Sequence, residues 1–365
     1  DTPWREQAQW LGDIALVHVP AIHACFGDTR LTGKFIRQSA VNQHPTGLLS
    51  NVSNTVNHAW QAAIPDYSLW WLRALWGYYL YTGEGRWIHR YYPEALRILH
   101  AHLDYINENG LIENMPYWIL IDWADVEKRG ECAAYNAIFY GALEAMAEMA
   151  RFKKDVRTEQ GALELRQNIA ASFQDAFFDT GRGCLADARM DGRLSPKTSE
   201  HANFSALRFG LCDEQTNRSI ITRLAEKHSV PDVTEAQPFF ATIVLQSLAR
   251  HGRFDLALRF IEDRWGKRML DRGATSAWEE WSCNGSWRDG DFKGFLRTHS
   301  HAWSAIPADF LIRGLMGLEI LEPGCKRVRL QPEKTAFDYR AVFPTSLGDI
   351  AVEWKNGELK TQTPE

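Results

Sequence analysis

The chain has 365 residues, with 41 Lys and Arg against 46 Asp and Glu, which gives a formal net charge of −5. Hydrophobic residues make up 45% and charged residues 24%, as in an ordinary globular protein, and this excludes an intrinsically disordered or collagen-like chain. No apolar run reaches the roughly 18 residues of a membrane helix, and an acidic balance without blocks of Lys or Arg argues against nucleic acid as the main partner.

Helical periodicity covers most of the chain and begins with a helix over residues 7–25, whose apolar residues recur every three or four positions. Pro20 lies inside this stretch, so we expect it to kink or end the helix. Ten further helices are predicted over residues 31–41, 67–81, 88–106, 133–149, 161–177, 201–211, 215–227, 239–249, 254–265 and 302–316.

Most of these helices form antiparallel pairs joined by short turns with glycine, such as His251-Gly252-Arg253. The pairs recur at roughly 45 to 65 residues, which is too irregular for a solenoid repeat of fixed period. We therefore predict an all-α fold, an (α/α)6 barrel of two concentric layers, over residues 1–320. An open helical array and an irregular helical fold are the alternatives. The odd number of helices would be explained by a barrel helix upstream of Asp1.

The tail has a different pattern. Short alternating segments follow Gly324 over residues 326–330, 339–343, 349–354 and 358–361, with turn residues between them. Asn356-Gly357 is a strong signal for a two-residue hairpin turn. We predict that residues 321–365 are the start of a C-terminal β-sandwich domain.

The six cysteines are scattered, without a C-x-x-C motif or a histidine at ligand spacing. We therefore expect neither a disulfide framework nor a zinc site. The chain opens on Asp1 instead of Met, directly in a polar and aromatic segment, so we expect it to be part of a longer protein. Its first residues do not indicate a localisation.

Three segments combine acids with aromatic residues, and the first covers residues 1–13, DTPWREQAQWLGD. Glu6, Trp10 and Asp13 share one face of the expected helix, because they lie at positions i, i+4 and i+7. Acids at the start of a helix also interact favourably with its dipole, so a solvated helix N-terminus is the alternative interpretation.

The second segment is Trp278-Glu279-Glu280-Trp281, followed by a loop rich in Gly, Asp and Trp. A carboxylate between two indoles is partly desolvated, which raises its pKa or holds it ready as a base. The alternative is an acidic surface turn. The chain contains 15 Trp, more than a core requires, so we expect several of them to line a ligand surface.

The third segment comprises Asp66-Tyr67, Tyr117-Trp118 and Asp122-Trp123, which place acids and aromatic residues just before helices, where the loops of a barrel mouth would lie. Helix capping is the simpler interpretation of Asp66. Further along, His299 and His301 make a poor metal site, because they lie at i and i+2 without a nearby acid, and contact with a substrate is favoured for one of them.

The sequence has no glycine-rich phosphate loop and no G-x-S-x-G motif, so nucleotide and acyl-serine chemistry find no support. Carboxylates, aromatic residues and a helical barrel together indicate a carbohydrate as the partner, because sugar rings present apolar faces to indoles and hydroxyl groups to Asp, Arg and His.

Residues 1–13 match throughout the pattern D-x-P-x-R-E-x-x-x-W-x-G-D, and here the sequence resembles the catalytic domain of bacterial α-L-rhamnosidases, glycoside hydrolase family 78. Residues 264–266 (RWG) and 269–279 (MLDRGATSAWE) match a second segment of that family, and residues 300–303 (SHAW) resemble its His-bearing helix start. The sequence departs from the family at Gln7-Ala8-Gln9, where Arg-Leu-Gly is usual, and at Tyr67, where Trp is common.

The resemblance implies a role for each matched residue. Glu6 would be the general acid that protonates the glycosidic oxygen, and Glu279 would be the general base that activates a water on the opposite face. The implied sugar contacts are Asp1, Arg5, Trp10, Asp13, Tyr67, Asp122, Trp123, Trp278 and His301.

The implied reaction is an inverting hydrolysis that releases terminal α-L-rhamnose, with the two carboxylates roughly 6.5–9.5 Å apart to admit water. Asp1 and Asp13 would help Glu6 to keep its proton, and Arg5 would oppose them. The scheme requires no metal and no cofactor. Glu280 is the alternative base. Two other functions remain open: a related barrel hydrolase of another α-linked sugar, and a catalytically silent sugar-binding relative.

Overall fold

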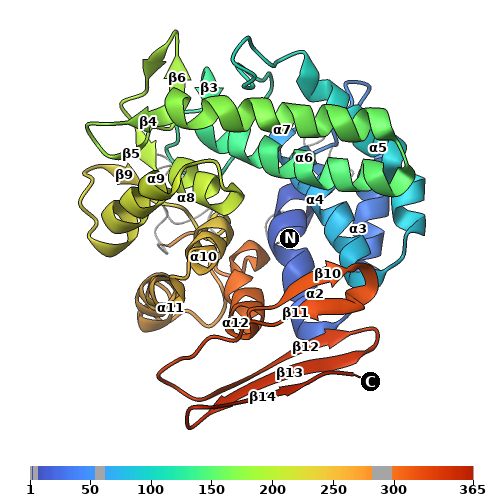
Figure 1. Cartoon of the computed structure of the whole chain (residues 1–365), viewed down its shortest axis with the longest axis vertical. Helices are drawn as coiled ribbons and strands as arrows, with labels where there is room; N and C mark the ends of the chain where they lie inside the picture. The colour runs from blue at the N-terminus through green and yellow to red at the C-terminus, as the bar shows by residue number, and fades with distance from the viewer. Residues whose placement is uncertain (1, 3–6, 54–61, 282–297, 365) are drawn as a thin grey trace.

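A computed structural model describes residues 2, 7–53, 62–281 and 298–364 of the chain (Figure 1). Within them, six helical segments pack side by side in chain order, and the last packs against the first, so they close into a ring. They are η1–α2 (Ile14–His18 and Val19–Phe26), α4 (Pro65–Thr82), α6 (Ala133–Lys153), α8 (Glu200–Phe209), α10 (Ala241–Arg250) and α12 (Ile306–Met316).

Outside this ring lies a second layer, in which each helix precedes the inner helix to which it is connected. In the described part of the chain these outer helices are α3 (Arg30–Val41), α5 (Arg86–Leu103), α7 (Val156–Phe177), α9–η3 (Glu214–Ile220 and Ile221–Glu226) and α11–η4 (Phe254–Ile261 and Glu262–Lys267). The two concentric layers confirm the prediction of an (α/α)6 barrel. The predicted helix upstream of Asp1 lies outside the chain and stays a prediction.

Helix α4 illustrates why these segments are helical. Pro65 occupies its first turn, where a missing N–H costs nothing, and Gly83 ends it in the left-handed conformation (φ 73°). Trp70 and Trp71 are 2% and 0% exposed, so these two indoles belong to the core. Trp76 is partly buried against the same core.

Pro20 does not end its helix. The chain stays helical from α1 (Leu11–Asp13) through η1 to Phe26, and the π-helical turn η1 stands immediately before α2, which carries Pro20 in its first turn. A wider π turn leaves the N–H of a residue in this position without a required acceptor, so the proline ring is accommodated. The predicted end of the helix at Pro20 is therefore wrong, and the predicted kink stays a prediction.

The tail forms an antiparallel sheet of β12 (Tyr339–Thr345), β13 (Gly348–Lys355) and β14 (Glu358–Gln362), which lies beside α2 and α12 (Figure 1). Asn356 and Gly357 join β13 to β14 with positive φ angles of 50° and 80°, which confirms the predicted hairpin. Alternate residues such as Phe343 and Val352 are buried against the end of the barrel.

Two further strands, β10 (Glu319–Glu322) and β11 (Arg327–Arg329), form a separate pair, so the first of them starts just before the predicted domain boundary at residue 321. The described tail thus contains a three-stranded and a two-stranded sheet, and a complete sandwich stays a prediction. None of the described helices is long and apolar enough to cross a membrane.

The loops on the side of the barrel away from the C-terminal sheet are connected by short strands. The sequence patterns did not predict these strands. They are β1 (Gln9–Trp10) with β2 (Val52–Ser53), β3 (Glu131–Cys132) with β6 (Ala188–Met190) and β7 (Arg193–Leu194), β4 (Phe178–Asp179) with β5 (Cys184–Leu185), and β8 (Thr198–Ser199) with β9 (Val233–Thr234). Most have only two residues, too few for an alternating pattern to be detected.

Candidate active site

A small pocket lies beside the amino ends of α4 and α12 and has an empty volume of about 280 Å³. It brings together six residues that the sequence predicted for the site, although they come from five separate segments of the chain. The lining residues are Trp10, Asp13, Ile64, Tyr67, Trp118, Leu120, Trp123, Glu279, His301 and Trp303.

The first wall comes from the start of α1. Strand β1 pairs with β2, and the amide of Leu11 donates to the carbonyl of Asn51 over 2.8 Å, which fixes where the helix begins. Asp13 then lies at the pocket, only 3% exposed, and Oδ1 of its carboxylate accepts a hydrogen bond from the Tyr67 hydroxyl. The alternative interpretation, a solvated helix N-terminus, is therefore wrong for Asp13, which forms a buried wall of the pocket.

Gly12 makes this wall possible. A Cβ atom at this position would lie 2.2 Å from two carbons of the Tyr67 ring, closer than any real contact allows. The glycine in the W-L-G-D motif is thus required by the approach of an aromatic ring from α4, and its φ angle is not positive.

The second wall is a loop pinned to the first turn of α4. The carboxylate of Asp66 accepts hydrogen bonds from the amides of Leu120 and Ile121, both over 3.1 Å. Burial raises the pKa of Asp66 to about 6, and these hydrogen bonds oppose the rise. The pinned loop places Trp118 and Trp123 at the pocket, where their rings lie 5.2 Å apart.

Asp122 points elsewhere. Its Oδ2 lies 2.8 Å from Nε2 of His201 and 2.7 Å from the amide of Gln237, and it is fully buried. Asp122 does not line the pocket, so in this structure it supports the loop that carries Trp123 from behind.

Glu279 forms the third wall and is 1% exposed. The amide of Thr298 donates to its Oε2 over 2.9 Å, and its backbone carbonyl accepts from the Trp303 indole over 2.8 Å. Glu280 is equally buried but does not line the pocket. Of the two adjacent glutamates, the geometry therefore favours Glu279 as the group that meets a ligand.

His301 and Trp303 complete the pocket. The amide of His301 donates to the carbonyl of Ala277, which ties this segment to the one before Glu279. The imidazole stacks on the Trp303 indole with 4.5 Å between ring centres, and its Nδ1 accepts from the Trp303 amide over 3.4 Å. The ring is thus held in one orientation beside the carboxylate.

Trp278 and Trp281, which flank the glutamates, do not line the pocket. The Trp278 ring packs on His299 at 5.0 Å, and the Trp281 indole donates to the carbonyl of Ala236 over 2.6 Å. The same carbonyl accepts from Arg264 over 3.4 Å. These contacts anchor both ends of the segment that presents Glu279.

Three predicted site residues, Asp1, Arg5 and Glu6, lie outside the described residues. Four lining residues were not among the predicted sugar contacts: Ile64, Trp118, Leu120 and Trp303. Trp118 and Trp303 could have been predicted, because Trp118 closely precedes Asp122-Trp123 and Trp303 closely follows His301. Ile64 and Leu120 are apolar residues that the sequence does not distinguish from core positions.

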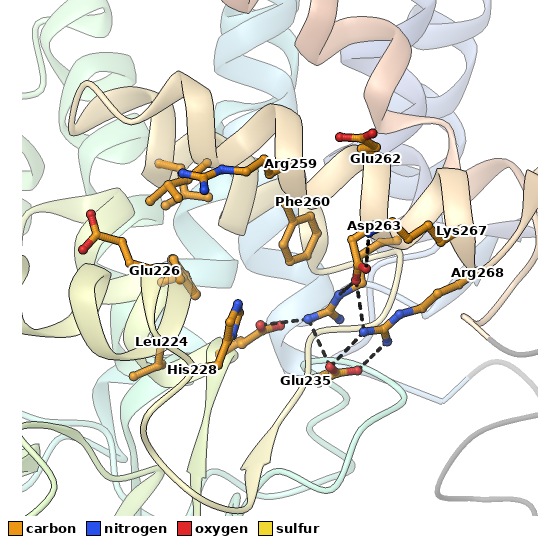
Figure 2. A pocket seen from close by; sticks show the side chains of 16 residues that line it. Leu224, Glu226, His228, Glu235, Arg259, Phe260, Glu262, Asp263, Lys267 and Arg268 are labelled. Atoms are coloured by element: carbon orange, nitrogen blue, oxygen red, sulfur yellow. Dashed lines mark hydrogen bonds and ion pairs between the residues drawn. The ribbon is translucent and has the colours of Figure 1, made fainter.

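A larger pocket of about 1240 Å³ empty volume lies between the outer helices α9–η3 and α11–η4. Figure 2 shows Arg268 reaching Glu235, with Asp263 and Lys267 beside them, and Arg268 and Glu235 are 2.7 Å apart. Lys267 and Arg268 neutralise Glu235 and Asp263, and the pocket contains none of the predicted site residues. We therefore regard the smaller pocket as the candidate active site.

The small pocket combines two buried carboxylates with four indole rings and a tyrosine, a combination suited to a ligand with both hydroxyl groups and apolar faces. Among the described residues, no group of three or more His, Cys, Asp or Glu side chains is arranged to hold a metal ion.

Comparisons with known proteins identify the family of the fold. Residues 1–315 match the family described as the bacterial alpha-L-rhamnosidase 6 hairpin glycosidase domain. The chain is 22% identical over 301 residues to an alpha-L-rhamnosidase of Formosa agariphila, and the match covers 78% of this chain and 30% of that protein.

Solved structures show the same fold. A GH78 family rhamnosidase of Bacillus sp. GL1 matches 99% of this chain and 38% of its own length, with a TM-score of 0.87 and 25% identity. A rhamnosidase from Klebsiella oxytoca with rhamnose bound matches 85% of this chain and 59% of its own, with a TM-score of 0.73 and 22% identity. The chain thus spans 30% to 38% of the Formosa and Bacillus relatives.

Proposed function

The chain belongs to the family of bacterial α-L-rhamnosidase six-hairpin glycosidase domains, and from this premise we propose that it hydrolyses the glycosidic bond of terminal α-L-rhamnose. The observation that carries the proposal is Glu279. It is a buried carboxylate, held by the Thr298 amide and directed into a pocket with aromatic walls.

In this proposal Glu279 is the general base. The Thr298 amide fixes one of its oxygens, and the Trp303 indole fixes its backbone, so the carboxylate keeps one orientation towards the pocket. It would accept a proton from the water that attacks the anomeric carbon. Glu6, which lies outside the described residues, would donate a proton to the leaving oxygen on the other face of the sugar.

Asp13 and the aromatic residues would bind the sugar itself. The Asp13 carboxylate suits sugar hydroxyl groups as an acceptor, and the indoles of Trp10 and Trp123 suit the apolar face and methyl group of rhamnose. The side chain of His301, oriented by Trp303, is positioned to contact a further hydroxyl group.

Hydrolysis of p-nitrophenyl α-L-rhamnoside tests the proposal, with Glu279→Gln compared with the matched variant Glu280→Gln. A positioned general base contributes roughly a hundredfold or more, so we expect kcat to fall at least that far for Glu279→Gln and much less for Glu280→Gln. Equal losses in the two variants would reject Glu279 as the base. The same comparison with Glu6→Gln tests the general acid.

Two further measurements separate the alternatives. Proton NMR during the first turnovers identifies the anomer released, and an inverting enzyme releases β-L-rhamnose from an α-linked substrate. A panel of aryl glycosides tests for another sugar. Binding of L-rhamnose without turnover of any glycoside would indicate a silent relative.

A further inference from the structure

A second cavity lies deeper in the barrel, at the other end of the inner helices. Along α4, Tyr67 faces the candidate active site, whereas Arg73 lies about 9 Å further along the helix axis and lines this cavity. The cavity has an empty volume of about 810 Å³ and is enclosed by α2, α4, α8, α10 and α12. Ile320 and Phe343 close it from the C-terminal strands.

The charged side chains that line this cavity are all basic. Arg73, Arg208 and Arg313 come from three different inner helices, and no Asp or Glu is among the described lining residues. The guanidinium groups of Arg73 and Arg208 both lie over the Phe209 ring, 5.1 Å and 5.5 Å from its centre. Two positive charges therefore contact the same aromatic ring.

The neighbouring acids compensate these charges incompletely. Arg73 donates to the carbonyl of Gly141 over 2.7 Å, but its nearest carboxylate, on Glu144, is 3.6 Å away. Arg313 lies 3.8 Å from Asp309. Both carboxylate distances are too long for a good hydrogen bond.

The positive charge of Arg208 is compensated still less by neighbouring acids. Its Nε donates to Oε1 of Gln246 over 2.8 Å, and it forms no ion pair with any residue that the structure describes. Burial, together with the positive charges of Arg73, Arg250 and Arg313, lowers the pKa of Arg208 to about 9, against the opposing effect of the Glu144 carboxylate. The cluster therefore carries an excess of positive charge in a partly enclosed place, where charges interact strongly.

We propose that this cavity is a binding site for a small oxyanion of the size and charge of phosphate or sulfate, held by Arg73, Arg208 and Arg313. Guanidinium groups present planar pairs of N–H donors that match the oxygens of such anions. The bound anion would neutralise the repulsion among the arginines and join α4, α8 and α12 next to the C-terminal sheet. This proposal does not depend on the proposed hydrolase activity.

Thermal unfolding in sodium phosphate or sodium sulfate, compared with sodium chloride at the same ionic strength and pH, tests the site. Binding to the folded state alone raises Tm, and at ten times the Kd we expect a rise of roughly 2 °C or more beyond that in chloride. Titration calorimetry with inorganic phosphate should give one site for each chain.

Two variants make the test specific. Arg208→Gln should abolish the phosphate-dependent rise in Tm, whereas Arg259→Gln, an equal loss of charge at an exposed position on α11, should retain it. If Arg208→Gln does not fold, Arg313→Gln replaces it, because that side chain is 39% exposed and its loss disturbs packing less.

An equal rise in chloride would overturn the proposal, and so would an undiminished phosphate effect in the cavity variants. Because the readouts are unfolding and binding, a failure to hydrolyse rhamnosides would leave the result of this test unchanged.

Discussion

The hydroxyl of Tyr67 donates a hydrogen bond to Oδ1 of Asp13 over 3.2 Å and links two segments that are 54 residues apart in the chain. Both residues are at most 3% exposed. A buried carboxylate requires hydrogen-bond donors, so this bond helps to hold Asp13 in place at the wall of the candidate active site. Tyr67, which stands where Trp is common in the family, thus acts as a support for an acid.

Replacing Tyr67 with Phe tests this role, since it keeps the ring and removes the donor. We expect the free energy of unfolding to fall by about 1 kcal/mol, and kcat/KM for the aryl rhamnoside to fall by up to about tenfold. Tyr92→Phe is the matched control, because Tyr92 donates to Asp155 over 2.9 Å far from the pocket. The Tyr92→Phe variant should lose stability but keep the kcat/KM of the wild type. Normal kinetics in both variants would contradict the role of the Tyr67 hydroxyl.

Replacing Gly12 with Ala tests the close approach behind the same bond. The added methyl group would lie 2.2 Å from the Tyr67 ring, so the ring or α1 must move, and overpacking of this kind costs about 1–3 kcal/mol. We expect a lower urea midpoint together with weaker catalysis. Gly161→Ala on α7 is the control: open space surrounds that position, so alanine should stabilise the helix by up to about 1 kcal/mol. An unchanged urea midpoint for Gly12→Ala would contradict the predicted clash.

The fold was largely predictable because apolar periodicity decides where long helices form. The segment predicted over 133–149 is α6 (Ala133–Lys153), which begins at the predicted residue and continues one turn further. Pro20 was interpreted from its local effect alone, and a π turn accommodated it. The two-residue strands lacked any pattern, since pairing across loops is a tertiary property.

The candidate site was predictable where acids and indoles stand together in one segment, as at Trp10 and Glu279. It was not predictable where orientation depends on distant partners. Asp122 faces His201, which lies 79 residues away, and nothing in the local sequence distinguishes that inward direction from one towards a ligand. The family resemblance supplied the pairing of Glu6 with Glu279, which spacing alone cannot supply.

Arg264 connects the outer layer to the segment that carries the candidate base. It is 4% exposed, pairs with Glu200 over 3.0 Å and shares the Ala236 carbonyl with the Trp281 indole. Trp281 follows Glu279 by two residues. Removal of the Arg264 side chain should therefore affect how Glu279 is held at the pocket, although Arg264 itself does not line it.

Arg264→Met should lower the free energy of unfolding by about 3–5 kcal/mol, since it leaves the buried Glu200 carboxylate without its cation. It should also lower kcat for the aryl rhamnoside. In the double variant Arg264→Met/Glu200→Met we expect stability to recover while kcat stays low. Arg259→Met, an exposed position on the same larger pocket, is the control and should change stability by less than about 1 kcal/mol. A normal kcat in the double variant would mean that Trp281 needs no anchor.

His102 makes the barrel sensitive to acid. It is fully buried on α5, where its Nδ1 donates to the carbonyl of Ile98 over 2.7 Å and its Nε2 accepts from the Tyr135 hydroxyl over 2.9 Å. The neutral ring satisfies both contacts. Burial lowers the pKa of His102 from 6.5 to about 4, since a proton on Nε2 would place a charge in the core.

Because the folded pKa lies below the unfolded one, the unfolded chain binds more protons between pH 6.5 and 4, and stability is lost as the pH falls through that window. From pH 7.5 to 5, the wild type should lose about 2 kcal/mol that His102→Gln does not lose, measured as free energies of unfolding in urea. His100→Gln, at an exposed position on the same helix, should behave as the wild type. The prediction is contradicted if the difference in free energy of unfolding between wild type and His102→Gln stays constant over this range. The ring of His102 would then be protonated in the folded protein as readily as in the unfolded chain.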